Sequence, residues 1–231
     1  MRPLGAGLAA RGVLVRAVRL AGHGTDVADL RRTRWTDWFA SVTEGHAALT
    51  AETPRVAVAG MSLGALLALH LAATRPAAVA ALVLCGTPIE LRDPRILWLP
   101  LLARVPFLRR RYALVPKPNG PDIADPAMRA ASRSYPAVPL GALVELLRLR
   151  AIVRRELSRV TQPALLLHGR HDHSVPVESM ASLRSALGSR RVEAHVLEQS
   201  WHVVTLDRDR DELVRLAGDF LADVDAAAPP T

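Results

Sequence analysis

The sequence predicts an α/β fold in which helices cover both faces of a mostly parallel sheet. Short apolar runs, typical of buried strands, alternate along the chain with longer segments whose apolar residues recur at helical spacing. Polar residues able to carry chemistry follow directly after three of these runs. The 231 residues, of which 50% are apolar, are enough for one domain with a core of two or three layers.

The first fifty residues predict two helices that flank one strand. Pro3 to Arg11 predicts a short helix that ends at Gly12, and Val13 to Leu20 predicts a strand. Apolar residues then recur at helical spacing at Trp35, Trp38, Phe39, Val42 and Leu49. We expect Thr33 or Thr36 to cap this amphipathic helix and both tryptophans to lie in the core.

Five residues, Gly60-Met61-Ser62-Leu63-Gly64, join a strand-like run to an apolar helical stretch. The run covers Arg55 to Ala59, and the helix covers Leu63 to Thr74, where Pro76 closes it. G-x-S-x-G at such a junction is the signature of a nucleophile elbow, whose serine sits on a strained turn above the sheet. We expect a Cβ to clash at either glycine, and the backbone N–H of Leu63 to face a developing oxyanion. An ordinary turn is the alternative for the pentapeptide alone.

Two further polar residues follow predicted strands in the second half of the chain. Asp172 lies just past the strand Pro163 to Gly169, and His202 follows the strand Val192 to Leu197. Serine, aspartate and histidine in this chain order, each beyond the carboxyl end of a strand, match the order of triads on α/β sheets. The sequence therefore predicts a catalytic triad of Ser62, Asp172 and His202.

Strand-like and helix-like segments alternate as far as the predicted strand Ala80 to Cys85, and residues from Thr87 to Val160 interrupt this alternation. We expect a single domain over 1–231 with a small helical cap inserted at approximately 88–160, including a helix near Leu140 to Leu157. Four apolar side chains of this insertion either contact the substrate or pack on the core beneath: Trp98, Leu101, Leu102 and Phe107. Beyond it, Val177 to Leu187 and the residues around Phe220 predict two more helices, and Ala226 to Thr231 a frayed tail.

The formal net charge of +8 comes almost entirely from arginine, because Lys117 is the only lysine. The arginine clusters are scattered, and no aromatic residues interleave them for base stacking: Arg31-Arg32, Arg109-Arg110-Arg111 and Arg154-Arg155. We interpret these clusters as solvated surface and expect no nucleic-acid partner.

Several other classes of protein are disfavoured. The apolar runs are too short to cross a bilayer, and Arg11 interrupts the start, so we expect neither stable membrane insertion nor a signal peptide. The single Cys85, inside a predicted strand, indicates a buried side chain and a cytoplasmic location. His168, His171 and His173 crowd one loop, but their spacing fits no common metal site. We expect no metal and no cofactor, since no dinucleotide or phosphate loop is present either.

These motifs resemble those of the small α/β-hydrolase carboxylesterases and bacterial monoacylglycerol lipases, the group that includes the thermostable bacillus esterases. The resemblance covers nearly the whole chain, in five segments: Leu20 to Thr25, Trp35 to Trp38, Gly60 to Gly64, His168 to Asp172 and Glu198 to Asp207. It implies that Ser62 is the nucleophile, that His202 is the base and then the acid, and that Asp172 orients the imidazole.

The sequence departs from this family in two places. Trp201 stands where many relatives have glycine, and we expect its ring to narrow the leaving-group side. Relatives also begin with a strand and a His-Gly-aromatic loop that supplies a second oxyanion donor, whereas Met1 to Leu4 resembles the helix after that loop. We therefore predict an N-terminally truncated α/β-hydrolase fold that lacks a strand between Val13 to Leu20 and the elbow. Either the natural chain begins upstream, which we favour, or the protein is a weakened relative.

The predicted activity is hydrolysis of a small-molecule carboxylic ester through an acyl-enzyme. A serine at the elbow leaves esterase, lipase, thioesterase, C–C hydrolase and perhydrolase open. The apolar cap favours esters of short to medium acyl chains, with monoacylglycerol as one case. The alternative is a non-catalytic protein that keeps the fold without the full oxyanion hole.

Overall fold

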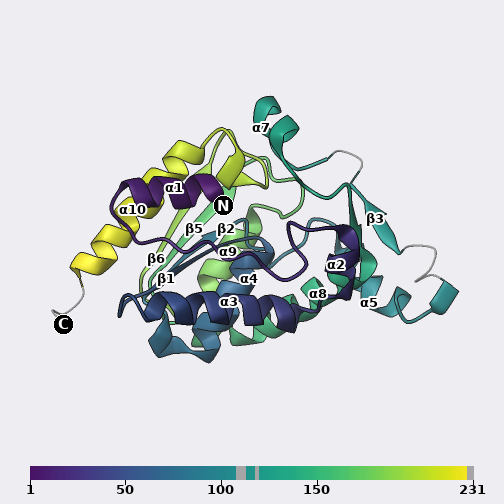
Figure 1. The fold of residues 1–231 in the computed structure, drawn as a ribbon, viewed down its shortest axis with the longest axis horizontal. Coiled ribbons are helices and arrows are strands. Elements are labelled where there is room, and N and C mark those ends of the chain that lie inside the picture. The colour runs from purple at the N-terminus through teal and green to yellow at the C-terminus, as the bar shows by residue number, and fades with distance from the viewer. Residues whose placement is uncertain (108–112, 118–119, 228–231) are drawn as a thin grey trace.

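The computed structural model describes residues 1–107, 113–117 and 120–227. A parallel sheet of four strands lies at its centre, in the order β1-β2-β5-β6 (Figure 1). These strands are β1 (Ala57–Met61), β2 (Ala81–Cys85), β5 (Ala164–Gly169) and β6 (Val192–Leu197). Each lies where the sequence predicts a strand, because apolar runs of this length suit parallel strands that helices cover on both faces. The predicted α/β architecture is confirmed.

Helices cover both faces of the sheet (Figure 1). One face carries α3 (Trp35–Thr50), α4 (Leu63–Thr74), α8 (Leu140–Glu156) and α9 (Glu178–Ala186), and the other carries α1 (Arg2–Ala10) and α10 (Arg210–Ala226). The α4 helix is apolar all round, and each residue from Ala65 to Ala73 is buried. Ser62, which directly precedes α4, is therefore attached to a helix that the core holds in place.

The stretch between β2 and α8 contains short elements. These are the 3-10 helix Pro94–Trp98, α5 (Leu99–Leu102), β3 (Leu114–Pro116), α7 (Pro126–Ala131) and β4 (Ala137–Pro139), with β3 and β4 paired antiparallel. The α8 helix begins at Leu140, as predicted, and its apolar residues join the core on the same face as α4. The last part of the expected insertion thus belongs to the main core, and a cap over the site stays a prediction.

The expected strand from Val13 to Leu20 is wrong. These residues have no strand pairing, and Val13, Leu14, Val15 and Val18 are 36–53% exposed. A strand needs hydrogen-bonding partners along its edge, and among the described residues none pairs with this segment as a strand. The β-branched composition alone therefore does not produce a strand here.

The cap of α3 also differs from the expected Thr33 or Thr36. Arg34 is the N-cap residue, and the Asp37 carboxylate accepts its backbone N–H at 2.8 Å. Thr33 ends the preceding helix α2 (Val27–Arg32), and its hydroxyl accepts the indole N–H of Trp38 at 2.8 Å. That bond fixes Trp38, which is fully buried as predicted, while Trp35 is half-buried against the same core.

In the described ranges, every helix is too short or too polar to cross a bilayer. The predicted frayed tail covers Ala226 to Thr231. Ala226 is instead the last residue of α10, and residues 228–231 lie outside the described ones.

Candidate active site

Ser62 occupies a strained turn between β1 and α4. Its φ is +51°, and among the described residues it is the one non-glycine with a positive φ. Two features hold this turn. The Ser62 amide donates to the carbonyl of Cys85 at 2.9 Å, and a Cβ on Gly60 would lie 2.3 Å from the carbonyl oxygen of Gly64. Strain of this kind persists only where the surroundings impose it, and it is common at functional sites.

The second glycine of the pentapeptide does not fit the expectation. A Cβ on Gly64 would meet no atom within 4 Å, so its predicted clash is wrong. Gly60 is confined between the strand and the first turn of α4, whereas Gly64 faces the open cavity beside them.

The amide of Leu63 is the first N–H of α4, a helix of 12 residues. Among the described residues it has no hydrogen-bond acceptor, as is usual for the first turn of a helix. The positive end of the helix dipole adds to this donor, so the position suits a developing negative charge.

His202 and Asp172 form a directly bonded pair. Nδ1 of His202 lies 2.7 Å from Oδ2 of Asp172, whose side chain is only 1% exposed. The other carboxylate oxygen accepts the amides of Ser174 and Val175 at 2.8 and 2.7 Å. Because an ionised carboxylate only accepts, Nδ1 of His202 carries the hydrogen, which leaves its Nε2 free to take up a proton.

A second histidine supports the acid. Nε2 of His168 lies 3.2 Å from both the Val175 carbonyl oxygen and Oδ2 of Asp172. A carbonyl oxygen can only accept, so this nitrogen carries a hydrogen and donates to both. Burial by itself would raise the pKa of Asp172, but the bonds from His168 and His202, the His202 charge and the Val175 amide together hold that pKa well below its usual value.

Close backbone approaches bring the histidine to the serine side of the sheet. Gly86 has φ +53° and follows Cys85, the β2 residue whose carbonyl accepts the Ser62 amide. A Cβ on Gly86 would lie 3.3 Å from two atoms of the His202 ring. At Gly169 a Cβ would lie 2.1 Å from the carbonyl oxygen of Trp201. Ser62 and His202 consequently line one cavity, with Asp172 buried behind the imidazole.

Comparisons with known proteins identify the family of this chain. The family model described as serine aminopeptidase, S33, matches residues 1–209. The chain belongs to this family of α/β-hydrolases. The predicted α/β-hydrolase fold and the resemblance to esterases and lipases are therefore confirmed.

Two relatives and one solved structure are similar to this chain over most of its length. The thermostable monoacylglycerol lipase of Bacillus sp. (strain H-257) is 31% identical over 223 residues, covering 96% of this chain and 84% of the lipase. The carboxylesterase of Bacillus subtilis (strain 168) is 26% identical over 226 residues, covering 97% of this chain and 87% of the esterase. A structure from work on two metagenome-derived lipolytic enzymes, LipS and LipT, has a TM-score of 0.87 at 28% identity, covering 98% of this chain and 87% of that one.

Among the expected substrate contacts whose side chains the structure describes, Trp201 alone lines the cavity. The His173 ring meets the indole edge-on at a centroid distance of 4.6 Å, and the Arg129 guanidinium lies 4.5 Å from the indole centroid. Oδ1 of Asp122 accepts a hydrogen bond from Nδ1 of His173 at 2.7 Å. This cluster gives one rim of the cavity a polar and aromatic character.

The expected substrate contacts from the insertion are not brought to Ser62. Trp98, Leu101 and Phe107 are 63%, 54% and 73% exposed, and they do not line the cavity that holds Ser62 and His202. The side chain of Leu102 lies outside the described ones. In the described part of the chain, no group of three or more metal-ligating side chains is placed to hold an ion.

Asp207 is a functional candidate that sequence reasoning missed. Its carboxylate is fully buried and accepts the amides of Ala124, Asp125, Trp201 and Arg208 at 2.8–3.0 Å. It thereby ties the loop after residue 120 to the histidine loop. The residues whose amides it accepts lie up to 83 positions away along the chain. No local sequence pattern therefore predicts that Asp207 joins these two loops.

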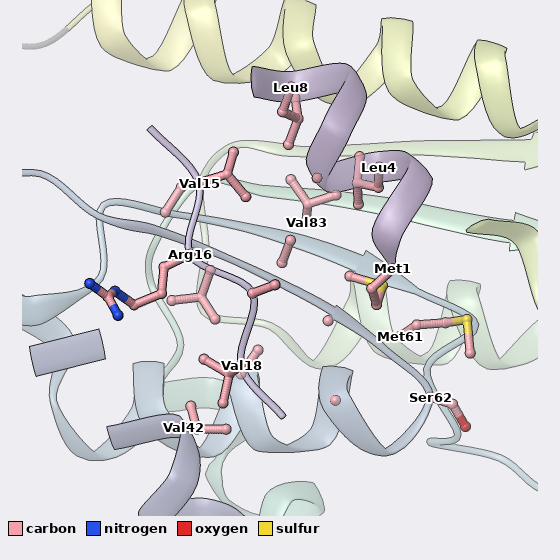
Figure 2. Close-up of a pocket in the computed structure, with 18 of the residues that line it drawn as sticks. Met1, Leu4, Leu8, Val15, Arg16, Val18, Val42, Met61, Ser62 and Val83 are labelled. Carbon is pink, nitrogen blue, oxygen red and sulfur yellow. The ribbon is translucent and has the colours of Figure 1, made fainter. Parts of the chain in front are cut away.

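The cavity extends well past the two catalytic candidates. Its volume is about 1770 Å³, larger than the 300–1,000 Å³ typical of small-molecule sites. Figure 2 shows the part that runs from Ser62 along β1, between α1 and the segment that carries Val15 and Val18.

Proposed function

We propose that this protein is a serine hydrolase that cleaves carboxylic esters. The observation that supports this most directly is the elbow: Ser62 at φ +51° lines one cavity with His202, whose Nδ1 is bonded to a buried carboxylate. The similarity to a monoacylglycerol lipase and a carboxylesterase favours esters as the substrate class.

In the proposed reaction, Nε2 of His202 takes the hydroxyl proton as Oγ of Ser62 bonds to the acyl carbon. The bond to the alcohol oxygen then breaks, and His202 returns the proton to the departing alcohol. Water attacks the resulting acyl-Ser62 while His202 accepts its proton, and the acid leaves as the serine hydroxyl is restored. Asp172 stabilises the imidazolium in both halves of the reaction.

The Leu63 amide is proposed to stabilise the oxyanion that forms twice in this cycle. A single donor of this kind is worth about 10²–10³ in kcat. We place the alcohol part of the ester beside Trp201, where Arg129 and His173 give the rim polar groups. Such a rim favours a small, hydroxyl-bearing alcohol, and we propose acyl chains of short to medium length.

The test is labelling with a fluorophosphonate probe together with hydrolysis of p-nitrophenyl butyrate. We expect wild-type protein to be labelled and active, and Ser62→Ala to lose both, because the probe requires an activated serine. Ser134 lines the same cavity, so Ser134→Ala is the matched control and should retain both signals.

Absence of labelling in wild-type protein that is folded by circular dichroism would favour the alternative, a non-catalytic member of the fold. Hydrolysis rates over acyl lengths from acetate to palmitate then locate the chain-length preference. A rate that rises steadily to palmitate would contradict the proposed short to medium range.

A further inference from the structure

Five described arginine and lysine side chains line the cavity that holds Ser62 and His202. Three of them are paired with carboxylates: Arg11 with Asp219, Arg16 with Glu52, and Arg55 with Asp225. Arg129 and Lys117 have no carboxylate partner among the described residues. A charge that is partly removed from water is costly unless it is paired, so these two cations mark the part of the cavity that suits an anionic ligand.

Arg129 is held by two contacts that leave most of its donors unused. Its Nε donates to the carbonyl of Ile123 at 2.7 Å, and its guanidinium carbon lies 4.5 Å from the indole centroid of Trp201, which directly precedes His202 in the chain. Stacking uses the face of the guanidinium, so the N–H groups of its two terminal nitrogens stay in the plane, and they have no acceptor among the described residues. Two such nitrogens form the planar fork that binds a carboxylate or a phosphate through two parallel hydrogen bonds.

The carboxylates of the cavity lining do not neutralise these two cations. Among the described residues, only Asp122 and Asp225 contribute carboxylates to the lining, and Asp225 is the partner of Arg55. Asp122 accepts the backbone amide of His173 at 3.0 Å, the ring of the same histidine at 2.7 Å and the hydroxyl of Ser174 at 3.3 Å. Because both carboxylates already have partners, the rim beside the indole keeps an excess of positive charge.

We propose that Arg129 binds an oxyanion group, a phosphate or a carboxylate, on the alcohol part of the ester, and that Lys117 adds a second positive charge. This inference rests on the proposed hydrolysis and names its substrate class, which is acyl esters of a small alcohol that carries an anionic group. The alcohol lies beside Trp201 in the proposed reaction, so its oxyanion meets the guanidinium that stacks on that ring. Hydrolysis then releases a carboxylic acid and the anionic alcohol.

The test compares esters that differ in one charged group. We expect kcat/KM for butyrylglycerol phosphate to exceed that for monobutyrylglycerol about tenfold, mainly through a lower KM, because the charged hydrogen bonds form when the substrate binds. The butyryl ester of glycolate, compared with ethyl butyrate, measures the same preference for a carboxylate and so distinguishes the two oxyanions. Monomethyl glutarate carries its charge on the acyl part, and it should have no advantage over methyl pentanoate.

Substitutions at the two cations test their roles. Arg129→Met should lower the ratio of kcat/KM for the phosphate ester to that for the neutral ester about tenfold, and a loss common to both esters cancels in this ratio. Arg129→Lys keeps the charge without the planar fork and should give an intermediate ratio. Lys117→Met should lower the ratio by a smaller factor, because this side chain is exposed. Arg16→Met is the matched control, since Arg16 lines the same cavity but is paired with Glu52, and it should keep the wild-type ratio.

Calorimetry on Ser62→Ala separates this inference from the proposed hydrolysis, because it measures binding of the two glycerol esters without turnover. We expect the phosphate ester to bind about tenfold more tightly, and Arg129→Met in the same background to remove that advantage. Equal Kd values together with equal kcat/KM would overturn the anion site and leave the hydrolase standing. A retained difference in Kd without hydrolysis of either ester would support the anion site and contradict the hydrolase. An unchanged preference in Arg129→Met would overturn the role of Arg129.

Discussion

The two sides of the sheet are built differently. On the β5 side, all six residues of the strand are buried, and the loops beyond β5 and β6 are held by buried carboxylates that accept backbone amides. On the β1 side, the strand has β2 as its one neighbour among the described strands, and Ala57 and Ala59 are exposed. The proposed acid and base belong to the enclosed side, while the proposed nucleophile belongs to the open one.

This difference shows how each catalytic candidate is positioned. Asp172 is held by two amides and two histidines, so its geometry depends on many bonds. Ser62 depends on one strand pairing, the close contact at Gly60 and the buried helix α4. Disruption on the β5 side should therefore affect the whole fold and the site, whereas disruption on the outer edge of β1 should be tolerated.

The largest effect is expected at the acid. Asp172→Asn keeps the shape of the side chain, but its amide group can donate to Nδ1 of His202 and so favours the wrong tautomer. We expect kcat for p-nitrophenyl butyrate to fall by about 10⁴, measured with protein whose fold is checked by circular dichroism.

Asp122→Asn is the matched control for that substitution. The Asp122 carboxylate also bonds to a histidine ring, with Oδ1 at 2.7 Å from Nδ1 of His173. Among the described residues, no hydrogen bond joins Asp122 to the ring of His202. We expect a change in kcat far smaller than that of Asp172→Asn. Equal losses in the two variants would mean that Asp172 acts only through the local fold.

The next largest effect is expected from the fully buried Asp207. Asp207→Ala leaves four backbone amides without their acceptor, and we expect the free energy of unfolding to fall by about 3–5 kcal/mol, measured in urea. Asp207→Asn keeps one acceptor oxygen and should lie between this variant and wild type. Asp211→Ala, at an exposed position, should change little. A small loss in Asp207→Ala would show that the amides find water instead.

A proline comparison tests the two sides of the sheet directly. Leu166 lies in the middle of β5, and Leu166→Pro should be less stable than Leu166→Ala by at least about 2 kcal/mol, because it removes a ladder hydrogen bond. Ala59→Pro should be within about 1 kcal/mol of wild type, since its amide faces outward. Comparable losses in urea unfolding at both positions would show that β1 is not a free edge.

The parts of the fold that the sequence predicts well are those that neighbouring residues decide. The bounds of α4, Leu63 to Thr74, match the structure because an apolar run starts after a glycine turn and stops before Pro76. Strand β6, Val192 to Leu197, also matches. The pairing of Asp172 with His202 was expected because both follow parallel strands, whose carboxyl ends meet at one edge.

The wrong predictions concern contacts between distant segments. Val13 to Leu20 has the composition of a strand, but a strand also needs a partner, and composition does not reveal one. The role of Asp207 depends on amides that approach from another loop. We expect Trp98 and Phe107 to contact either the substrate or the core beneath, yet both are mostly exposed, because the surface that an apolar side chain meets depends on the tertiary fold.

The smallest effect is expected at Gly64, and it concerns the open side of the sheet. A Cβ there meets no atom within 4 Å, and alanine is the better helix former by about 1 kcal/mol, so Gly64→Ala should leave the protein as stable as wild type or slightly more stable. Gly60→Ala is the counterpart, because its Cβ would lie 2.3 Å from a backbone oxygen and must displace the elbow. Urea unfolding of both variants measures the contrast, and a marked loss in Gly64→Ala would mean that the space beside Gly64 is filled in solution.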